Sequence, residues 1–341
     1  MGTCISDEGD GAWSRRSRSI SSRRNECKNL PGERVKNPAR SENLPCSARY
    51  PCEVRKKHGS QYGAHYERKN RRSSSKSAAK MMLQEVYGSN EVCYEATTSD
   101  RDAAKAAGTS LTYGEIHHEG VRKLMDRHHL NVKKAKVLLD IGSGSGKLAI
   151  QCFDRYKLDR VIGVEISSHR YGKSVAALKS YAKYVNKSPT CSASYREFDT
   201  CYKCHLVHVS PPGEETGNTC GCSINGHCRV IEMYNTDIGN LRALVRAAKP
   251  EVVVMDVMIH GLLPESIVEI LAQLPVGARV ATFEKIDDKW PTQIPFPFVP
   301  TNPGDSYRTT WNSSHGFHLW RRTGRYVGNE CVLSHHRRSI E

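Results

Sequence analysis

A glycine-rich turn between an apolar strand and a helix is the feature of this sequence that most constrains its fold. The apolar run Val137–Ile141 stops at Gly142-Ser143-Gly144-Ser145-Gly146, and residues 147–156 can follow as a helix. Closely spaced glycines let the backbone turn sharply and approach a ligand. Strand, turn and helix in this order predict the first unit of an open α/β sheet that binds a ligand at the carboxyl ends of its strands.

The same alternation continues along the chain. Apolar runs predict further strands at 160–165, 229–234, 251–256 and 279–283. Helical spacing of apolar residues predicts intervening helices, among them one through residues 175–185 and one that opens at Pro264 and Glu265. We therefore predict a Rossmann-like α/β fold, with a mostly parallel sheet covered by helices on both faces.

The glycine loop discriminates among three cofactors. A P-loop requires Ser or Thr after Gly-Lys, whereas Gly146-Lys147 is followed by Leu148. A dinucleotide loop reads G-x-G-x-x-G, whereas this loop reads G-x-G-x-G and follows Asp140, whose carboxylate would repel a pyrophosphate. S-adenosylmethionine carries an ammonium and a sulfonium and no phosphate. The loop therefore favours this methyl donor.

Two acids that follow the next strands support this choice. Glu165 ends the second predicted strand, where a carboxylate can accept hydrogen bonds from ribose hydroxyls, and Asp237 follows the third, where a carboxylate can take an adenine amino group. Each acid alone is more often a solvated loop residue. Together with the glycine loop they predict a class I S-adenosylmethionine-dependent methyltransferase. The candidate cofactor-binding residues from this pattern are Asp140, Gly142, Gly144, Gly146, Glu165 and Asp237.

The N-terminal part of the chain is strongly basic. Residues 1–80 hold 19 Lys or Arg against 8 Asp or Glu, and so carry +11 of the formal net charge of +15. High charge with few apolar residues cannot offset chain entropy, so we predict a disordered arm over 1–100, the methyltransferase domain over 101–328 and a tail over 329–341. A basic arm suits a polyanion, most commonly nucleic acid, although a solubilising tail has the same composition.

The sequence leaves two cellular locations open. No apolar stretch is long enough to span a membrane, which predicts an intracellular protein whose cysteines are thiols or metal ligands. The start Met1-Gly2-Thr3-Cys4-Ile5-Ser6 also fits an N-myristoylation pattern, with Cys4 as a candidate for palmitoylation. Acylation of Gly2 and Cys4 would anchor the chain at a membrane, and an unmodified start is the alternative.

Further motifs resemble the disruptor of telomeric silencing family, the histone H3 lysine methyltransferases that lack a SET domain. The resemblance runs from about 110 to 323 and lies in Tyr113-Gly114-Glu115-Ile116, the Asp140–Lys147 loop, the Gly-Val-Glu-Ile-Ser segment at 163–167, the segment 274–280, Thr310-Trp311 and Trp320-Arg321. It implies that Tyr113 and Glu115 close over the methionine part of the cofactor. It also implies that Gly142, Gly144 and Glu165 contact the cofactor.

The sequence departs from that family at the fourth strand. Members with histone activity carry a polar segment such as Asn-Asn-Phe beside the transferred methyl, whereas this chain reads Met255-Asp256-Val257-Met258. Asp256 stands at the second Asn, where it would hydrogen-bond an incoming amine and attract its charged form. We predict a nuclear lysine methyltransferase of nucleosomal histone H3, with Tyr113 and Asp256 as catalytic residues and DNA bound by the arm. Methylation of RNA or of a non-histone protein, or a catalytically silent chromatin or membrane adaptor, stays open.

Cysteine and histidine residues gather in a predicted insertion at 188–228. Cys201 and Cys204 have the C-x-x-C spacing of a zinc knuckle, and Cys220-Gly221-Cys222 with His227-Cys228 can complete a tetrahedral site. The preferred zinc ligands are Cys201, Cys204, Cys220 and Cys228. Such a zinc would be structural, because methyl transfer to nitrogen does not need it, and a polar loop with unligated thiols is the alternative.

Overall fold

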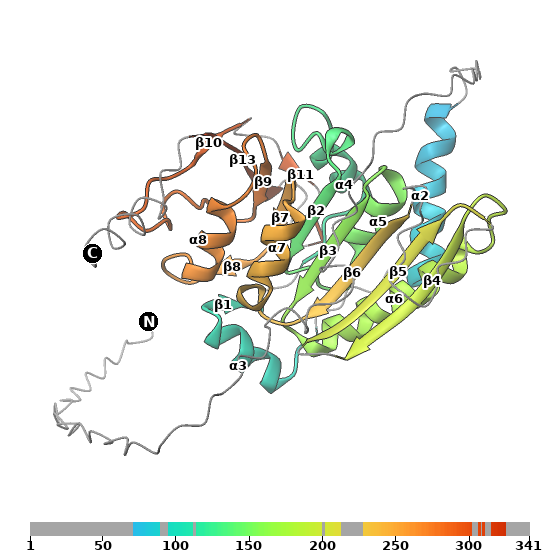
Figure 1. Cartoon of the computed structure of the whole chain (residues 1–341), viewed down its shortest axis with the longest axis horizontal. Coiled ribbons are helices and arrows are strands. Elements are labelled where there is room, and N and C mark those ends of the chain that lie inside the picture. Colours follow the sequence, from blue (N-terminus) through green and yellow to red (C-terminus); the bar gives the residue numbers. More distant parts are fainter. Residues whose placement is uncertain are drawn as a thin grey trace, which may run out of the picture. The chain divides into compact units, whose positions relative to one another are not determined.

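A nine-stranded sheet forms the centre of the molecule in a computed structural model (Figure 1). The structure describes residues 71–88, 95–111, 114–199, 202–212, 228–301, 306–307, 309–310 and 315–324. Its strand order is β10-β13-β9-β7-β2-β3-β6-β5-β4. The bounds are β2 Val137–Ile141, β3 Arg160–Glu165, β4 Ser192–Asp199, β5 Lys203–Ser210, β6 Arg229–Asn235, β7 Val252–Met255, β9 Arg279–Thr282, β10 Phe298–Pro300 and β13 His318–Arg322.

The central strands run in one direction. Parallel pairing joins β6 to β3, β3 to β2, β2 to β7 and β7 to β9, and the antiparallel strands β13 and β5 continue the sheet on either side. Each of the five strands predicted from apolar runs forms within a residue or two of its expected bounds. The predicted Rossmann-like class I methyltransferase fold is therefore confirmed.

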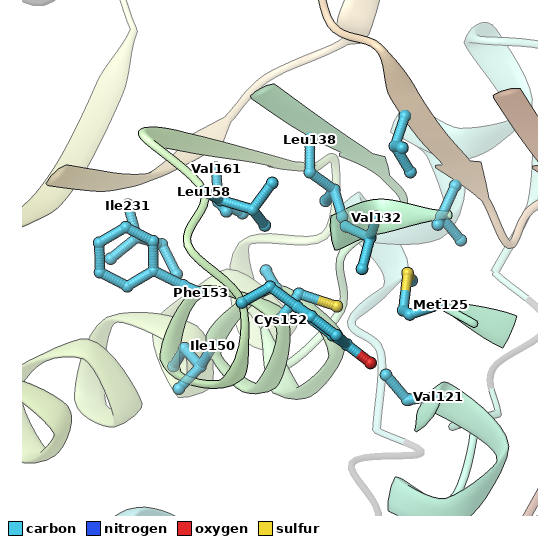
Figure 2. Close-up of a cluster of buried hydrophobic side chains, with 14 of the residues drawn as sticks. Val121, Met125, Val132, Leu138, Ile150, Cys152, Phe153, Leu158, Val161 and Ile231 are labelled. Carbon is cyan, nitrogen blue, oxygen red and sulfur yellow. The ribbon is translucent and has the colours of Figure 1, made fainter. Parts of the chain in front are cut away.

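Alternate residues of the central strands face two separate hydrophobic layers. Leu138 of β2 packs with α5 and its neighbours, whereas the next residue, Leu139, faces α7 and α8. Figure 2 shows Leu138 and Val161 in the first layer together with Ile150 and Phe153 of α5. The first layer contains α2 Arg71–Tyr87, α4 His118–Leu124, α5 Lys147–Arg155 and α6 Ser168–Val185, and the second contains η2 Ile238–Leu241, α7 Arg242–Ala248 and α8 Glu265–Ala272. Helices thus cover both faces, as predicted.

The segment that the sequence predicts to be disordered contains one whole helix, α2, and the first residues of a second, α3 (Thr98–Ala106). Met82 and Val86 of α2 are buried, and the helix packs against α5 and α6. The predicted boundary at residue 100 is therefore wrong for 71–88 and 95–100, because the apolar partners of α2 lie far along the chain and leave no local pattern. Residues 1–70 and the predicted tail at 329–341 lie outside the described residues.

The described part of the predicted insertion is a β-hairpin. Strands β4 and β5 pair antiparallel from Ser192 with Ser210 to Asp199 with Lys203, and β5 pairs in turn with β6. The alternative of a polar loop is therefore excluded for these residues, which extend the main sheet. Residues 200–201 and 213–227 lie outside the part that the structure describes.

A short strand pair forms beside the carboxyl ends of the central strands. β1 (Thr109–Ser110) pairs with β8 (Met258–Ile259), and this brings the segment after α3 to the residues that follow β7. A second short pair joins β11 (Ser306–Tyr307) to β12 (His315–Gly316). Within the ranges that the structure describes, no helix is both long enough and apolar enough to cross a membrane.

Candidate cofactor and active site

An open cleft of about 740 Å³ lies where the loops after β2, β3, β6 and β7 meet. In the sheet, β3 and β6 lie on one side of β2, whereas β7, which follows β6 in sequence, lies on the other side. The crevice between β2 and β7 is therefore a topological switch point. Four of the predicted site residues line this cleft: Gly142, Glu165, Asp237 and Asp256. Residues of β1 and the start of α8 form its other wall.

The glycine loop adopts a backbone that only glycine tolerates well. Gly142, Gly144 and Gly146 have φ angles of +76°, +55° and +81°. A Cβ on Gly142 would overlap the Cγ1 atom of Val257, and one on Gly146 would lie 2.9 Å from the Cε atom of Met233. The loop is therefore fixed by close packing against the strands on both sides, and its backbone lies open to the cleft at Gly142.

Glu165 is a buried carboxylate that is held by two backbone amides. Its Oε2 accepts a hydrogen bond from Gly144 N at 2.8 Å and its Oε1 one from Ser167 N at 2.8 Å. Burial raises the pKa of Glu165, although these amides and the Arg170 guanidinium act in the opposite direction. Each carboxylate oxygen has a second lone pair, and the side chain lines the cleft, so it can accept from two ligand hydroxyls.

Asp237 is placed by a helix start. It caps η2, with its Oδ1 accepting a hydrogen bond from Gly239 N at 2.6 Å. The half-buried side chain lines the cleft next to Ile238, and Ile166 lies in the wall nearby. An apolar wall with one carboxylate at its rim suits a flat heterocycle that carries an amino group.

Asp140 lies in a second, smaller pocket of about 370 Å³ that shares Gly142 and Asp256 with the cleft. The Asp140 side chain is 2% exposed, and its Oδ2 has no hydrogen-bond partner among the described residues. Burial and the neighbouring charges of Asp256 and Glu165 raise the pKa of Asp140 to about 8. A buried carboxylate without a partner favours a cationic ligand, which an ammonium group supplies.

Asp256 stands at the junction of the two pockets. It directly follows β7, so its side chain lies beside the glycine loop that follows β2. Part of the side chain reaches the surface, but the surrounding protein raises the pKa of the Asp256 carboxyl to about 7 by burial. Near neutral pH this group can therefore exist in either protonation state.

Glu115 is tied to the glycine loop from outside the central sheet. Its Oε1 accepts a hydrogen bond from Ser145 Oγ at 3.0 Å, and its Oε2 forms an ion pair with Lys147 Nζ. Its backbone N–H donates to Thr310 Oγ1 at 3.0 Å. Glu115 thus borders the smaller pocket, whereas Tyr113 lies outside the described residues. Sequence reasoning missed Ser145 and Lys147, although Lys147 directly follows the loop.

Sequence reasoning also missed the contacts that hold α3 and β1 over the cleft. The buried Arg170 donates through Nη2 to the Leu111 carbonyl at 2.6 Å. Asp100 of α3 accepts a hydrogen bond from Ser168 N at 2.7 Å. Both partners belong to the start of α6, directly after Glu165. A capping box at Thr97 and Asp100 was the only local sequence signal for α3.

The two described cysteines of the predicted zinc site, Cys204 and Cys228, are not brought together. Cys204 is buried within the hydrophobic layer of α7 and α8, and it pairs with Tyr234 across β5 and β6. Cys228 Sγ lies 3.4 Å from Nδ1 of His208, four residues further along β5 and so about 13 Å from Cys204. A single ion cannot bind both thiolates, so the set with both Cys204 and Cys228 is wrong. Cys201 and Cys220 lie outside the described residues, and the rest of the chain described here holds no metal-binding group of three or more His, Cys, Asp or Glu.

A sequence model described as "Histone methylation protein DOT1" matches residues 95–188. The chain resembles the DOT1 histone methylation proteins. The match covers less than a third of the chain, but it includes more than half of the residues that line the cleft, among them Gly142 and Glu165. The DOT1 resemblance and the predicted enzyme class, an S-adenosylmethionine-dependent methyltransferase, are therefore confirmed.

Other comparisons add little beyond the DOT1 match. An O-methyltransferase from Bacillus cereus in complex with SAH is 11% identical, with a TM-score of 0.31, over 60% of this chain and 65% of the other. An rRNA methylase from Streptococcus thermophilus is 14% identical, with a TM-score of 0.28, over 60% of this chain and 94% of the other. A search of curated proteins finds no match. Because these TM-scores are low, the fold assignment rests on the strand order.

Proposed function

We propose that this protein transfers a methyl group from S-adenosylmethionine to a lysine of a nucleosomal histone, with histone H3 as the substrate that the DOT1 resemblance implies. The position of Asp256 carries the choice of an amine as the acceptor. Its carboxyl group lies where the cofactor cleft meets the smaller pocket, and its pKa of about 7 suits contact with an amine. A carboxylate at this point attracts a cationic acceptor, whereas it would repel a phosphate.

The predicted cofactor contacts follow from the chemistry of the two pockets. Asp140 would bind the ammonium of the methionine part, Glu165 both ribose hydroxyls and Asp237 the adenine amino group. The glycines would let the loop backbone approach the sulfonium, and Glu115 and Tyr113 would close over the methionine part. When bound, S-adenosylmethionine supplies an electrophilic methyl group whose loss leaves a neutral thioether.

The reaction needs a neutral lysine amine. The lysine nitrogen forms a bond to the methyl carbon while the carbon–sulfur bond breaks, and its electrons remain on sulfur. Because free lysine has a pKa of about 10.4, the site must remove a proton or desolvate the ammonium before attack. The Asp256 carboxylate is the group that can accept this proton or orient the amine by a hydrogen bond. Alignment and exclusion of water supply the rest of the rate.

The basic residues that precede α2 support a nucleosomal substrate. We infer that the arm binds DNA while the pocket receives the lysine, which places the protein in the nucleus. Acylation at Gly2 and Cys4 would instead place it on a membrane. A Gly2→Ala variant separates these two, because it would leave membranes while keeping its nucleosome affinity. That the predicted insertion at 188–228 holds a structural zinc also remains a proposal.

Radiolabelled methyl transfer to nucleosomes, free histones and RNA, measured side by side, tests the proposed substrate. We expect lysine-bound label on nucleosomal histone. Label on RNA would favour the RNA alternative, and cofactor binding without transfer to any acceptor would favour a silent adaptor. Arm deletion should remove only residues 1–70, because α2 begins at Arg71. Loss of each phosphate contact should lower the slope of log affinity against log salt by about 0.9.

A further inference from the structure

Tyr87, the last residue of α2, contacts the glycine loop from outside the central sheet. Its hydroxyl donates a hydrogen bond to the Ser145 carbonyl oxygen at 3.1 Å. The Nζ atom of Lys147 lies 5.4 Å from the centre of the Tyr87 ring, within reach of a cation–π interaction. The matched DOT1 region begins at residue 95, so α2 and Tyr87 lie before it in the sequence.

The Tyr87 hydroxyl binds the half of the glycine loop that lies next to the start of α5. Gly142 and Ser143 both donate to the Val164 carbonyl, at 2.8 and 3.0 Å, so the first half of the loop is fixed by β3. Gly144 N still donates to the Glu165 carboxylate of β3, and from Ser145 onward the chain turns into α5. The Ser145 carbonyl, at the start of this turn, is held by Tyr87.

The same half of the loop supports Glu115 at the smaller pocket. The Ser145 hydroxyl donates to one carboxylate oxygen of Glu115, and Lys147 pairs with the other. Tyr87 therefore contacts both Ser145 and Lys147, which bind the two carboxylate oxygens of Glu115. A shift of the Ser145–Lys147 segment would move Glu115 and open the pocket that contains Asp140.

Packing of α2 against its neighbouring helices fixes the position of Tyr87. Figure 1 shows α2, in blue, beside α5 and α6, and Met82 and Val86 bury their side chains in the layer that these helices share. Gly88 follows with a φ of +67°, so the helix ends directly after Tyr87. The tyrosine thus projects from the end of a helix docked by its apolar side.

We infer that Tyr87 is a positioning residue for the cofactor, which keeps the Ser145–Lys147 segment and Glu115 in the form that binds S-adenosylmethionine. The inference rests on the proposed cofactor contacts of the smaller pocket. Without the Tyr87 hydroxyl, the glycine-rich segment populates other conformations, and the apparent affinity falls by the fraction that remains competent. A hydrogen bond of ordinary strength limits this effect to roughly threefold to tenfold.

Calorimetric titration of the full chain with S-adenosylhomocysteine tests the inference on Tyr87→Phe, with Tyr184→Phe as the matched control. Tyr184 is also half-buried, but it lies in α6 and stacks on Tyr181. We expect Tyr87→Phe to weaken binding about threefold to tenfold and to raise the KM for S-adenosylmethionine without lowering kcat at saturation. Tyr184→Phe should bind like the unaltered protein. Tyr87→Leu, which also loses the ring beside Lys147, should weaken binding further.

Equal affinities of Tyr87→Phe and the unaltered protein would overturn the inference while leaving the cofactor assignment intact. A fall in melting temperature with unchanged affinity would do the same, because it would assign Tyr87 to stability alone. Absence of binding by the unaltered protein would instead refute the cofactor assignment and, with it, the positioning role.

Discussion

Residues that can bind a metal or a ligand lie at the carboxyl ends of the central strands and in the β4–β5 hairpin at one side of the sheet. Among the described residues, only those at the carboxyl ends are gathered into a site. At the carboxyl ends of β2, β3, β6 and β7, separate loops converge and bring Asp140, Glu165 and Asp256 into neighbouring pockets. On β5, Cys204 faces the layer of α7 and α8, whereas the next residue, His205, contacts Tyr171 of α6 on the opposite face. Because side chains alternate along a strand, neighbouring Cys and His residues of β5 point to opposite faces of the sheet and do not meet in one site.

At the hairpin edge, both ring nitrogens of His205 already have partners. The Tyr171 hydroxyl lies 2.5 Å from Nδ1 of His205, and Nε2 of His205 lies 3.3 Å from Glu197 of β4. These contacts tie α6 to the hairpin. By contrast, Oδ2 of Asp140 has no partner within the described ranges, at the edge where we place the cofactor. The comparison separates polar residues that complete a fold from polar residues that await a ligand.

The largest expected effect is at the cofactor edge. Gly142→Ala should abolish measurable binding of S-adenosylhomocysteine, because the new Cβ would overlap Val257 and strain a backbone with a φ of +76°. The matched control is Gly172→Ala in α6, where a Cβ meets nothing within 4 Å. Replacement there should leave binding unchanged and stabilise the helix by about 0.5–1 kcal/mol. Calorimetric titration and thermal unfolding measure both, and full binding by Gly142→Ala would contradict the placement of the cofactor.

The next effect concerns the reaction itself. Asp256→Asn keeps a hydrogen-bond acceptor but removes the charge, so we expect kcat to fall about hundredfold while cofactor affinity changes far less. The pH dependence is informative here. In the unaltered enzyme kcat should rise with pH as Asp256 ionises, with a midpoint below the pKa of about 7 of the free protein because the bound cofactor is cationic, and the variant should lack this rise. An unchanged pH profile in Asp256→Asn would assign the proton transfer elsewhere.

Most of the fold and half of the site followed from local patterns. The strands β2, β3, β6, β7 and β9 are mainly apolar runs, and the glycine loop, Glu165 and Asp237 stand at strand ends, where position alone predicts that they converge. Contacts between distant segments left no such pattern. Tyr87 and Arg170 reach the site only through the packing of α2 and the position of β1, and neither has a local sequence signal.

A pH dependence of cofactor affinity sharpens the assignment of Asp140. In the free protein the pKa of Asp140 is about 8, so at pH 7 this group is mostly protonated. A bound ammonium favours the carboxylate, lowers its pKa and releases a proton, so affinity should rise with pH, by at most about tenfold per unit, and level off above about 8. Asp140→Asn should bind more weakly and lack this component. The amino group of the ligand titrates in both proteins, so their difference isolates Asp140.

Measured affinities at pH 6, 7 and 8 in two buffers of different ionisation enthalpy report the released proton directly. Parallel pH profiles for Asp140→Asn and the unaltered protein would mean that the ammonium does not bind beside Asp140.

The smallest expected effect is on stability, and it concerns the two described cysteines in and beside the β4–β5 hairpin. Cys204 is fully buried, so Cys204→Ala should destabilise the fold by about 1–2 kcal/mol through loss of packed volume. Cys228 is half-buried, and Cys228→Ala should cost less than about 0.5 kcal/mol. Burial also raises the pKa of the Cys204 thiol, so the neutral form persists in the native state and should resist alkylation. Denaturant unfolding, alkylation and metal analysis of both variants check this. Loss of bound zinc in Cys204→Ala would instead show that Cys204 is a ligand and that the hairpin edge, too, gathers its residues into a site.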